Sequence, residues 1–195
     1  LDAARNAADE IIPLFVLDPG ILKAKSTGSR RVAFLLGCLD SLQKNLQHAG
    51  ARLILRKGNP QDVISEIAGE IQVDAIFWNR DYEPYARKRD RQVEDICSEL
   101  GIEVSTHEDL CLCPPGTVLK KDGDPYTVFT PFSRQWKNQY NDSPRPRPQS
   151  LKTPKSVRSN SLPLPEDLGH GVDIDIPEAG ERAARQRLES FVDRA

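Results

Sequence analysis

The stretch Ala-Ile-Phe-Trp-Asn-Arg-Asp-Tyr-Glu-Pro-Tyr-Ala-Arg-Lys-Arg-Asp, residues 75–90, decides the fold of this chain. Its first four residues form a short apolar run, which is typical of a strand buried on both faces. Pro84 suits the first position of a helix, and Glu83 suits the positive end of the helix dipole. Helical spacing then relates a row of side chains that ends at Gly101: Tyr85, Arg89, Val93, Ile96 and Leu100. The stretch therefore predicts a strand, a polar turn and a helix.

Similar units lie on either side of this stretch. Buried strands are predicted over residues 11–17, 53–55, 75–78 and 102–105, and helices over residues 1–10, 29–49, 60–71 and 84–100. The clearest helix, 29–49, carries an apolar stripe made by Val32, Leu35, Leu36, Leu39, Leu42 and Leu46. Strict alternation with short loops implies parallel strands joined by crossovers. We therefore predict an α/β fold, a doubly wound parallel Rossmann-like sheet with helices on both faces.

Three loops follow the carboxyl ends of predicted strands, at residues 18–21, 57–60 and 79–83. Parallel strands bring such loops to one edge of the sheet, where open α/β folds bind ligands. At that edge Asp18 and Asp81 would offer hydrogen-bond acceptors, and Phe15 and Trp78 would offer apolar walls. This combination suits a planar ring with hydrogen-bonding groups better than a phosphate. The plainer interpretation is an ordinary strand-to-helix loop in which Glu83 caps the helix.

The alternation ends beyond His107. Residues 118–129 suggest a hairpin with Asp122-Gly123 at its turn, and residues 132–140 suggest a short helix. The next stretch, rich in proline, serine and basic residues, is predicted to be a linker, and an amphipathic helix is predicted at the end of the chain. The expected organisation is an α/β domain over residues 1–140, a linker over 141–177 and the start of a helical domain over 178–195.

The composition is that of a globular protein. Of 195 residues, 38% are hydrophobic and 29% charged, and a net charge of −2 gives no overall attraction to DNA. No apolar run approaches the roughly 20 residues that cross a bilayer. Four cysteines in a chain this large suggest reduced thiols and a cytoplasmic location. Because the chain has no methionine and no strand before its first helix, we expect it to be a fragment.

Several kinds of site are disfavoured by spacing. Neither a G-x-G-x-x-G nor a P-loop motif occurs, which disfavours nucleotide binding. A stand-alone nucleotide-binding module is an alternative that ATP binding by the chain would support. His107, Cys111 and Cys113 lack the paired C-x₂-C spacing of structural zinc sites, and we expect no metal. The basic run over residues 87–91 is interleaved with acids, which favours a solvated helix face over a nucleic-acid contact. No catalytic constellation is present.

The central turn resembles a family signature. Asn79-Arg80-Asp81-Tyr82-Glu83-Pro84-Tyr85, followed by Arg89 and Asp90, is similar to the N-x-D-x-E-P-Y-x-x-x-R-D pattern of DNA photolyases and cryptochromes. Three further segments, 14–19, 125–136 and 180–195, resemble in order the family's antenna strand, its P-Y-x-V-F-x-P-F-x-x-x-W segment and the first helix of its flavin domain. Ser133 departs from the pattern, because many relatives carry tryptophan there, and this bears on local packing.

The resemblance implies the N-terminal antenna-binding domain of a photolyase, most like a class I cyclobutane pyrimidine dimer photolyase, truncated at both ends. In that family an antenna, 8-hydroxy-5-deazaflavin or methenyltetrahydrofolate, absorbs light and passes the energy to FAD, which drives splitting of the dimer. The motif leans towards the deazaflavin. The resemblance assigns the antenna site to Phe15, Val16, Leu17, Asp18, Arg31, Asn79, Asp81 and Glu83.

The same resemblance implies that FAD and UV-damaged DNA bind to a helical domain missing from the chain. We therefore expect the chain alone to be inactive in repair, to be a monomer and to have no membrane contact. The alternative is a cryptochrome, a blue-light photoreceptor that signals through partners. The E-P-Y-x-x-x-R-D form favours the repair enzyme.

Overall fold

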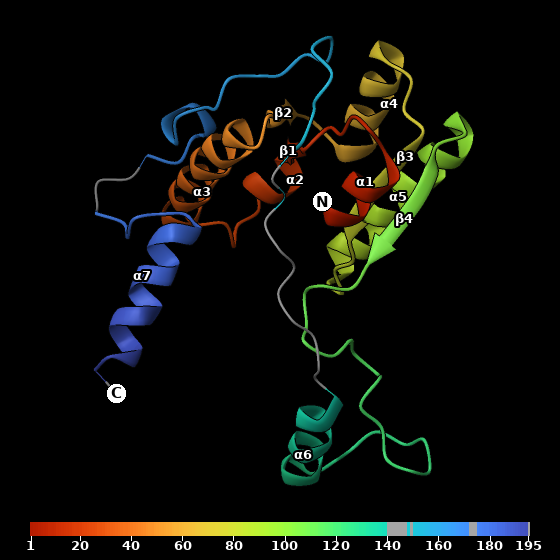
Figure 1. Ribbon diagram of the computed structural model, residues 1–195, viewed down its shortest axis with the longest axis vertical. Coiled ribbons are helices and arrows are strands. Elements are labelled where there is room, and N and C mark those ends of the chain that lie inside the picture. Colours follow the sequence, from red (N-terminus) through yellow and green to blue (C-terminus); the bar gives the residue numbers. More distant parts are fainter. Residues whose placement is uncertain (140–147, 149, 172–174, 195) are drawn as a thin grey trace. The chain divides into compact units, whose positions relative to one another are not determined.

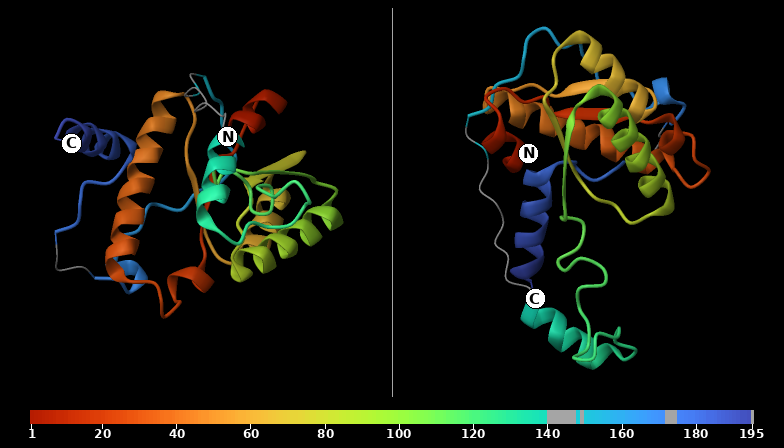
Figure 2. Two further views of the ribbon diagram at one scale, coloured as in Figure 1. Left: turned by 90° about the horizontal axis from the view of Figure 1, so that it is seen from below. Right: turned by 90° about the vertical axis from the view of Figure 1, so that its right-hand side faces the viewer.

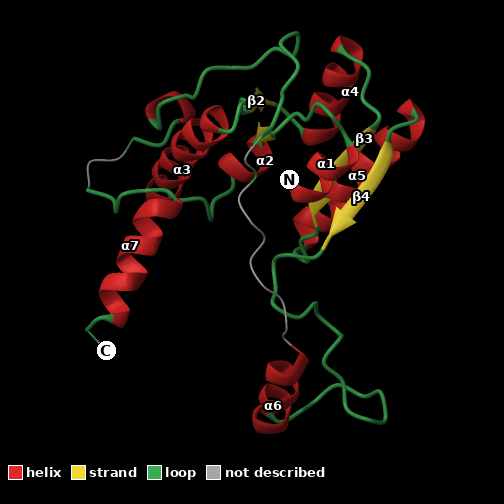
Figure 3. Ribbon diagram, viewed as in Figure 1, coloured by secondary structure: helices red, strands yellow, loops and turns green. Residues whose placement is uncertain are grey.

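The computed structural model describes residues 1–139, 148, 150–171 and 175–194, and it contains parallel strands connected by helices (Figure 1). The chain divides into two compact units, one made by residues 1–73 and 148–195 and the other by residues 74–147. Each unit contains one pair of parallel strands, shown in yellow in Figure 3. The predicted α/β class with parallel strands is confirmed. None of the described helices is long and apolar enough to cross a membrane.

The first unit is built around the strands β1 (Leu14–Leu17) and β2 (Ile54–Lys57), which pair in parallel with Leu14 opposite Ile54. The long helix α3 (Ser29–His48) connects them after the single-turn helix α2 (Pro19–Leu22). The unit also contains α1 (Asp2–Ala7), α4 (Pro60–Glu70), the 3₁₀ turn η1 (Glu166–Leu168) and α7 (Glu181–Val192). Pro13 precedes β1, and the observed strand is shorter than the predicted 11–17 because pairing begins only at Leu14.

The core of the first unit lies under α3. Most of the predicted stripe is buried, and Val32, Leu36, Leu39 and Leu46 pack with apolar side chains of both strands. Each such side chain contributes roughly 1.5–3 kcal/mol when removed from water. The prediction is wrong at Leu42, which is 42% exposed, while Ala33 is buried instead. A helix of 20 residues shows one face to the core, and Leu42 lies at the margin of that face.

A segment that we call the strap, residues 150–160, covers the side of β2 that does not pair with β1. The backbone N–H of Leu55 donates to Ser159 Oγ (3.0 Å), and its carbonyl accepts from the Asn160 N–H (2.8 Å). Arg52 donates from Nη2 to the carbonyls of Pro154 (2.9 Å), Lys155 (3.2 Å) and Val157. Leu151 and Val157 are buried. The strap lies inside the expected linker, so this described part of the linker is packed rather than free.

The two ends of the strap are tied to other elements of the first unit. At its start, the Leu151 N–H donates to the Ala49 carbonyl (2.7 Å), beside Gly50, whose φ is +90°. Near its end, Arg158 and Arg56 share the carboxylate of Glu70, with Arg56 Nη2 2.7 Å from both Glu70 oxygens. Further along the chain, α7 begins against α3, where Gly37 and Ser41 approach Ala179 and Gly180 closely (Figure 2).

The second unit consists of β3 (Ala75–Asn79), α5 (Pro84–Leu100), β4 (Glu103–His107) and α6 (Phe129–Gln139). The strands pair in parallel with Ala75 opposite Glu103 and Asn79 opposite His107. As predicted, α5 begins at Pro84 and stops before Gly101, which has a φ of +69°. Of the side chains related by helical spacing, Val93 is buried and Tyr85 and Leu100 are exposed; Ala86 and Cys97 complete the buried face of α5.

The region after β4 differs in detail from its prediction. The expected hairpin is reduced to one antiparallel bridge between Leu119 and Pro125, closed by a turn at Gly123 with a φ of +88°. Helix α6 begins at Phe129, three residues before the predicted start, and the last predicted residue, Tyr140, lies outside the described residues. Likewise the expected linker 141–177 is described only at residues 148, 150–171 and 175–177.

Candidate functional site

The first part of the predicted site lies at the carboxyl end of β1. Asp18 is the N-cap of α2, and its Oδ1 accepts a hydrogen bond from the Gly20 N–H (2.8 Å). Its side chain is only 4% exposed, which makes it a buried polar residue at the point where the strand ends. A carboxylate at this position stabilises the first turn of α2, because the free N–H groups of a helix start need acceptors. Asp18 therefore holds the loop in shape.

The other predicted residues of the first unit have different surroundings. Leu17 is buried and Phe15 is packed against the core, so both strand residues support the fold, while Val16 is half-buried. Arg31 lies in the first turn of α3, and its Nη2 donates to the Ser26 carbonyl. It also lines a hollow of about 630 Å³ together with Phe34 and Pro177. In this unit the structure thus joins Arg31 to the loop that precedes α3.

The second part of the predicted site is the turn over residues 79–83, between β3 and α5. The segment that leaves β4 holds this turn. The Arg80 N–H donates to the His107 carbonyl (2.8 Å), and Arg80 Nε donates to Thr106 Oγ1 (2.9 Å). Asn79 Nδ2 donates to Asp109 Oδ2 (2.9 Å). These bonds follow from the register of the strands, since Asn79 pairs with His107 at their common end.

Asp81 and Glu83 occupy the far part of the turn. Asp81 Oδ1 accepts from the Glu83 N–H (3.2 Å), a local bond typical of aspartate in turns. Its second oxygen, Oδ2, has no hydrogen-bond partner among the residues that the structure describes. Glu83 is the N-cap residue of α5, but its side chain makes no capping bond and is exposed. The turn therefore offers two carboxylates as acceptors.

Tyr82 and Glu108 form a hydrogen-bonded pair that joins the turn to the segment after β4. The Tyr82 hydroxyl donates to Glu108 Oε2, and this bond, followed by burial, raises the pKa of Tyr82 to about 12. Arg80 Nη1 lies 3.7 Å from Glu108 Oε1. No local sequence pattern pointed to this pair, because the two residues are 26 positions apart. A confident register for β3 and β4 would have suggested that they meet.

A buried donor lies just before the turn. Trp78 Nε1 is inaccessible to solvent and has no hydrogen-bond partner among the described residues. A buried N–H without a partner costs free energy, so such groups often mark a position where something else can bind. Among the described residues of the second unit, Trp78 Nε1 is thus a buried donor without a partner in the strand that leads into the turn.

Two of the three residues considered for a metal, His107 and Cys113, contact other groups. The His107 ring stacks on Phe77, with 6.3 Å between ring centroids, and its Nε2 lies 3.2 Å from Ser105 Oγ. Cys111 is exposed and Cys113 is half-buried, with its Sγ 3.8 Å from the Trp136 carbonyl. Within the described part of the chain, no three His, Cys, Asp or Glu side chains are grouped so that they could hold a metal ion.

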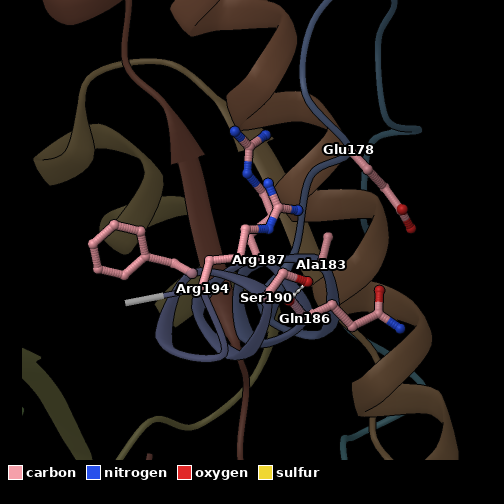
Figure 4. Close-up of a pocket in the computed structure, with 7 residues that line it drawn as sticks. Glu178, Ala183, Gln186, Arg187, Ser190 and Arg194 are labelled. Atoms are coloured by element: carbon pink, nitrogen blue, oxygen red, sulfur yellow. Dashed lines mark hydrogen bonds between the residues drawn. The ribbon is translucent and has the colours of Figure 1, made fainter.

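A second hollow, of about 410 Å³, runs along α7 (Figure 4). Figure 4 shows the side chains of Arg187 and Arg194 extending to the same side of the helix, while Glu178 points away. None of the residues predicted for the antenna site lines it. Its lining comes almost entirely from one helix, which gives a shallow groove rather than an enclosed site.

Comparison with known proteins agrees with the geometry. The family model described as DNA photolyase matches residues 1–152. A deoxyribodipyrimidine photo-lyase of Synechococcus sp. is 39% identical over 100% of this chain and 42% of its own length. Cryptochrome-1 of Sylvia borin is 27% identical over 97% of this chain and 33% of its own length. The crystal structure of a bacterial class III photolyase from Agrobacterium tumefaciens aligns with a TM-score of 0.80 and 27% identity, over 98% of this chain and 40% of that one.

These matches cover nearly all of the chain but less than half of each of these three relatives, 42%, 33% and 40% of their lengths. The matched region of the family model includes β1 and α2, the turn 79–83 and the segment after β4. All eight residues predicted for the antenna site therefore lie within the matched region, whereas the hollow along α7 lies outside it. With the family model matched over residues 1–152, this chain belongs to the DNA photolyase family.

Proposed function

We propose that this chain is the antenna-binding part of a deoxyribodipyrimidine photolyase, which repairs cyclobutane pyrimidine dimers in DNA with light. The observation that carries the proposal is the 39% identity to the Synechococcus sp. photolyase over the whole chain, against 27% for Cryptochrome-1 of Sylvia borin. The turn 79–83 supports it, because the side chains of Asn79 and Arg80 and the Arg80 N–H are bonded to the segment that leaves β4, while Asp81 Oδ2 has no described partner.

The proposal assigns the antenna to the residues named from the sequence. Asp81 would accept a hydrogen bond from the ring, Asn79 and Glu83 would border it, and Asp18 would hold the loop after β1. Phe15, Val16 and Leu17 would support that loop from the strand, and Arg31 would supply a cation. That all eight belong to one site remains a prediction. The bound antenna would supply light absorption and energy transfer, and this chain's residues would orient it.

The domain boundaries belong to the same proposal. Residues 1–140 would form the antenna domain, 141–177 the linker and 178–195 the first helix of the FAD-binding domain. FAD and UV-damaged DNA would bind to regions that correspond to the rest of the relatives' length, so we expect no repair by these 195 residues alone. We further propose a monomer in the cytoplasm.

Chromophore retention tests the antenna assignment. The purified protein is mixed with 8-hydroxy-5-deazariboflavin or with methenyltetrahydrofolate, passed through gel filtration and examined by its absorption spectrum. We expect one of the two to be retained, and Asp81→Ala to abolish its retention. Asp95→Ala, an exposed carboxylate on α5, is the matched control and should retain as much as wild type. Unchanged retention by Asp81→Ala would place the antenna elsewhere.

A cryptochrome is the second candidate, and the 27% identity to Cryptochrome-1 over 97% of the chain favours keeping it. A chimera separates the two: this chain replaces the matched 42% of the Synechococcus sp. photolyase, and dimer-containing DNA is illuminated with blue light. Light-dependent repair that an antenna chromophore enhances would support the photolyase function. Repair that never responds to a retained antenna would support the cryptochrome.

A further inference from the structure

The turn 79–83 is fixed by two neighbouring carboxylates that follow β4. Asp109 binds the beginning of the turn through Asn79. Glu108 binds its middle, because one of its oxygens accepts from the Tyr82 hydroxyl and the other lies 3.7 Å from Arg80 Nη1. Arg80 and Tyr82 are the two sequence neighbours of Asp81. A single carboxylate thus holds the residues on both sides of the one whose Oδ2 has no described partner.

These contacts determine what the turn can offer to a ligand. A tyrosine hydroxyl has one proton to donate, and Tyr82 gives it to Glu108. Arg80 is a cation next to Asp81 in the chain, and Glu108 and Thr106 engage its guanidinium. Without Glu108, Arg80 would be free to pair with Asp81 and to neutralise it. Glu108 therefore leaves Asp81 as an anionic acceptor, which selects a ring that presents an N–H or O–H donor.

We propose that Glu108 is a positioning residue of the antenna site, which acts by holding Arg80 and Tyr82 away from Asp81. The inference rests on the proposed antenna function of the turn and adds a residue that does not itself touch the ring. The advantage is preorganisation, since a turn already fixed loses less conformational entropy when the ligand binds. The same hydrogen bond from Tyr82 to the Glu108 carboxylate raises the pKa of Tyr82 to about 12, which makes the contact accessible to titration.

The test compares Glu108→Gln and Glu108→Ala with the control Glu103→Gln, an exposed glutamate of the same unit at the start of β4, the strand that Glu108 follows. Tyr82 ionisation is read from absorbance at 295 nm near pH 10.5, with Tyr82→Phe subtracted to isolate its signal. Wild-type Tyr82 should be almost entirely protonated there, whereas both Glu108 variants should move its pKa towards the ordinary value of about 10. An unchanged ionisation of Tyr82 would overturn the positioning role.

Chromophore binding completes the test, with 8-hydroxy-5-deazariboflavin as the probe. We expect Glu108→Ala to weaken binding about tenfold and Glu108→Gln less, because glutamine still accepts from Tyr82. Glu103→Gln should bind as wild type does. If wild type binds the probe and Glu108→Ala binds it equally well, the positioning role is refuted while the antenna function stands. If wild type retains neither the deazaflavin nor methenyltetrahydrofolate, the proposed function itself fails.

Discussion

Replacing Gly50 by alanine should destabilise the first unit through its contact with the strap. Gly50 has a φ of +90°, and a Cβ added there would lie 2.7 Å from the Leu151 carbonyl oxygen. The backbone strain alone costs about 1–3 kcal/mol for a residue other than glycine. The strap can relieve the overlap only by moving, which breaks the 2.7 Å bond from the Leu151 N–H to the Ala49 carbonyl and costs about 1 kcal/mol more.

Alanine also reduces the conformational entropy of the unfolded chain, which raises the free energy of unfolding by about 0.4–1 kcal/mol and offsets part of the loss. The net expectation for Gly50→Ala is a loss of about 1–3.5 kcal/mol in the free energy of unfolding, or roughly 2–4 °C in Tm per kcal/mol for a chain of this size. Gly69→Ala is the matched control. Gly69 lies in α4 with no atom within 4 Å of its added Cβ, so alanine should stabilise it by about 0.5–1 kcal/mol.

Urea unfolding followed by far-UV circular dichroism measures both variants. Hydrogen exchange locates the effect, because the Leu151 amide should exchange faster in Gly50→Ala while the amides of β3 and β4 should not change. Tryptophan fluorescence adds a separate signal, since Trp78 and Trp136 both belong to the second unit. If Gly50→Ala unfolds within about 0.5 kcal/mol of wild type, the strap does not lie against Gly50 and the reasoning is refuted.

Three further predictions concern the strap and the cysteines. Arg52→Ala should lower the free energy of unfolding by about 2–3 kcal/mol, because Nη2 has two protons and can donate to two of the three strap carbonyls at once. Replacing the exposed Arg182 by alanine is the control, and it should change the free energy of unfolding by less than about 0.5 kcal/mol in the same urea titration. The hydrogen bond from Arg56, and then that from the Arg158 N–H, lower the pKa of Glu70 below its ordinary 4.5. The stabilisation that the Glu70 carboxylate contributes is therefore present above pH 4.5 and is lost as the pH falls through the lowered pKa. The difference in stability between wild type and Glu70→Gln should shrink on acidification, and a constant difference between about pH 7 and 3 would contradict this. Burial raises the pKa of the Cys97 thiol, so a thiol reagent at neutral pH should modify the exposed Cys111 first and Cys97 only as the second unit unfolds. Equal rates of modification of Cys97 and Cys111 would contradict the buried position of Cys97.

The strand-turn-helix around Pro84 could be predicted because each of its signals is local. The apolar run, the proline at the first helical position and Gly101 at the end all act within a few residues, and the structure confirms β3 and α5 at nearly those bounds. Helical spacing relates Tyr85 and Leu100 to Val93, but the spacing alone does not show which side of α5 is buried. Packing selects the smaller Ala86 and Cys97 instead, and that choice depends on neighbours that the sequence does not reveal.

The contacts of the site were less predictable than its residues. Asp18 and the turn 79–83 stood out from the sequence, but the partners Thr106, Glu108 and Asp109 depend on where β4 ends. The predicted strand ended at Ser105, two residues before the observed end at His107. The strap was hidden by composition, since prolines and serines suggested a free linker. The isolated apolar residues Leu151 and Val157 were the only signal that the segment packs.

The discontinuous first unit has a consequence for synthesis on the ribosome. Residues 1–73 emerge early, yet the open side of β2 and the Arg52 guanidinium have no partners until residues 150–160 have been synthesised. Residues 74–147 are contiguous, so that unit can close before the first one has all of its parts. A nascent chain of this protein therefore exposes an unpaired strand border for the time needed to translate about ninety codons, an interval in which a chaperone would be most useful.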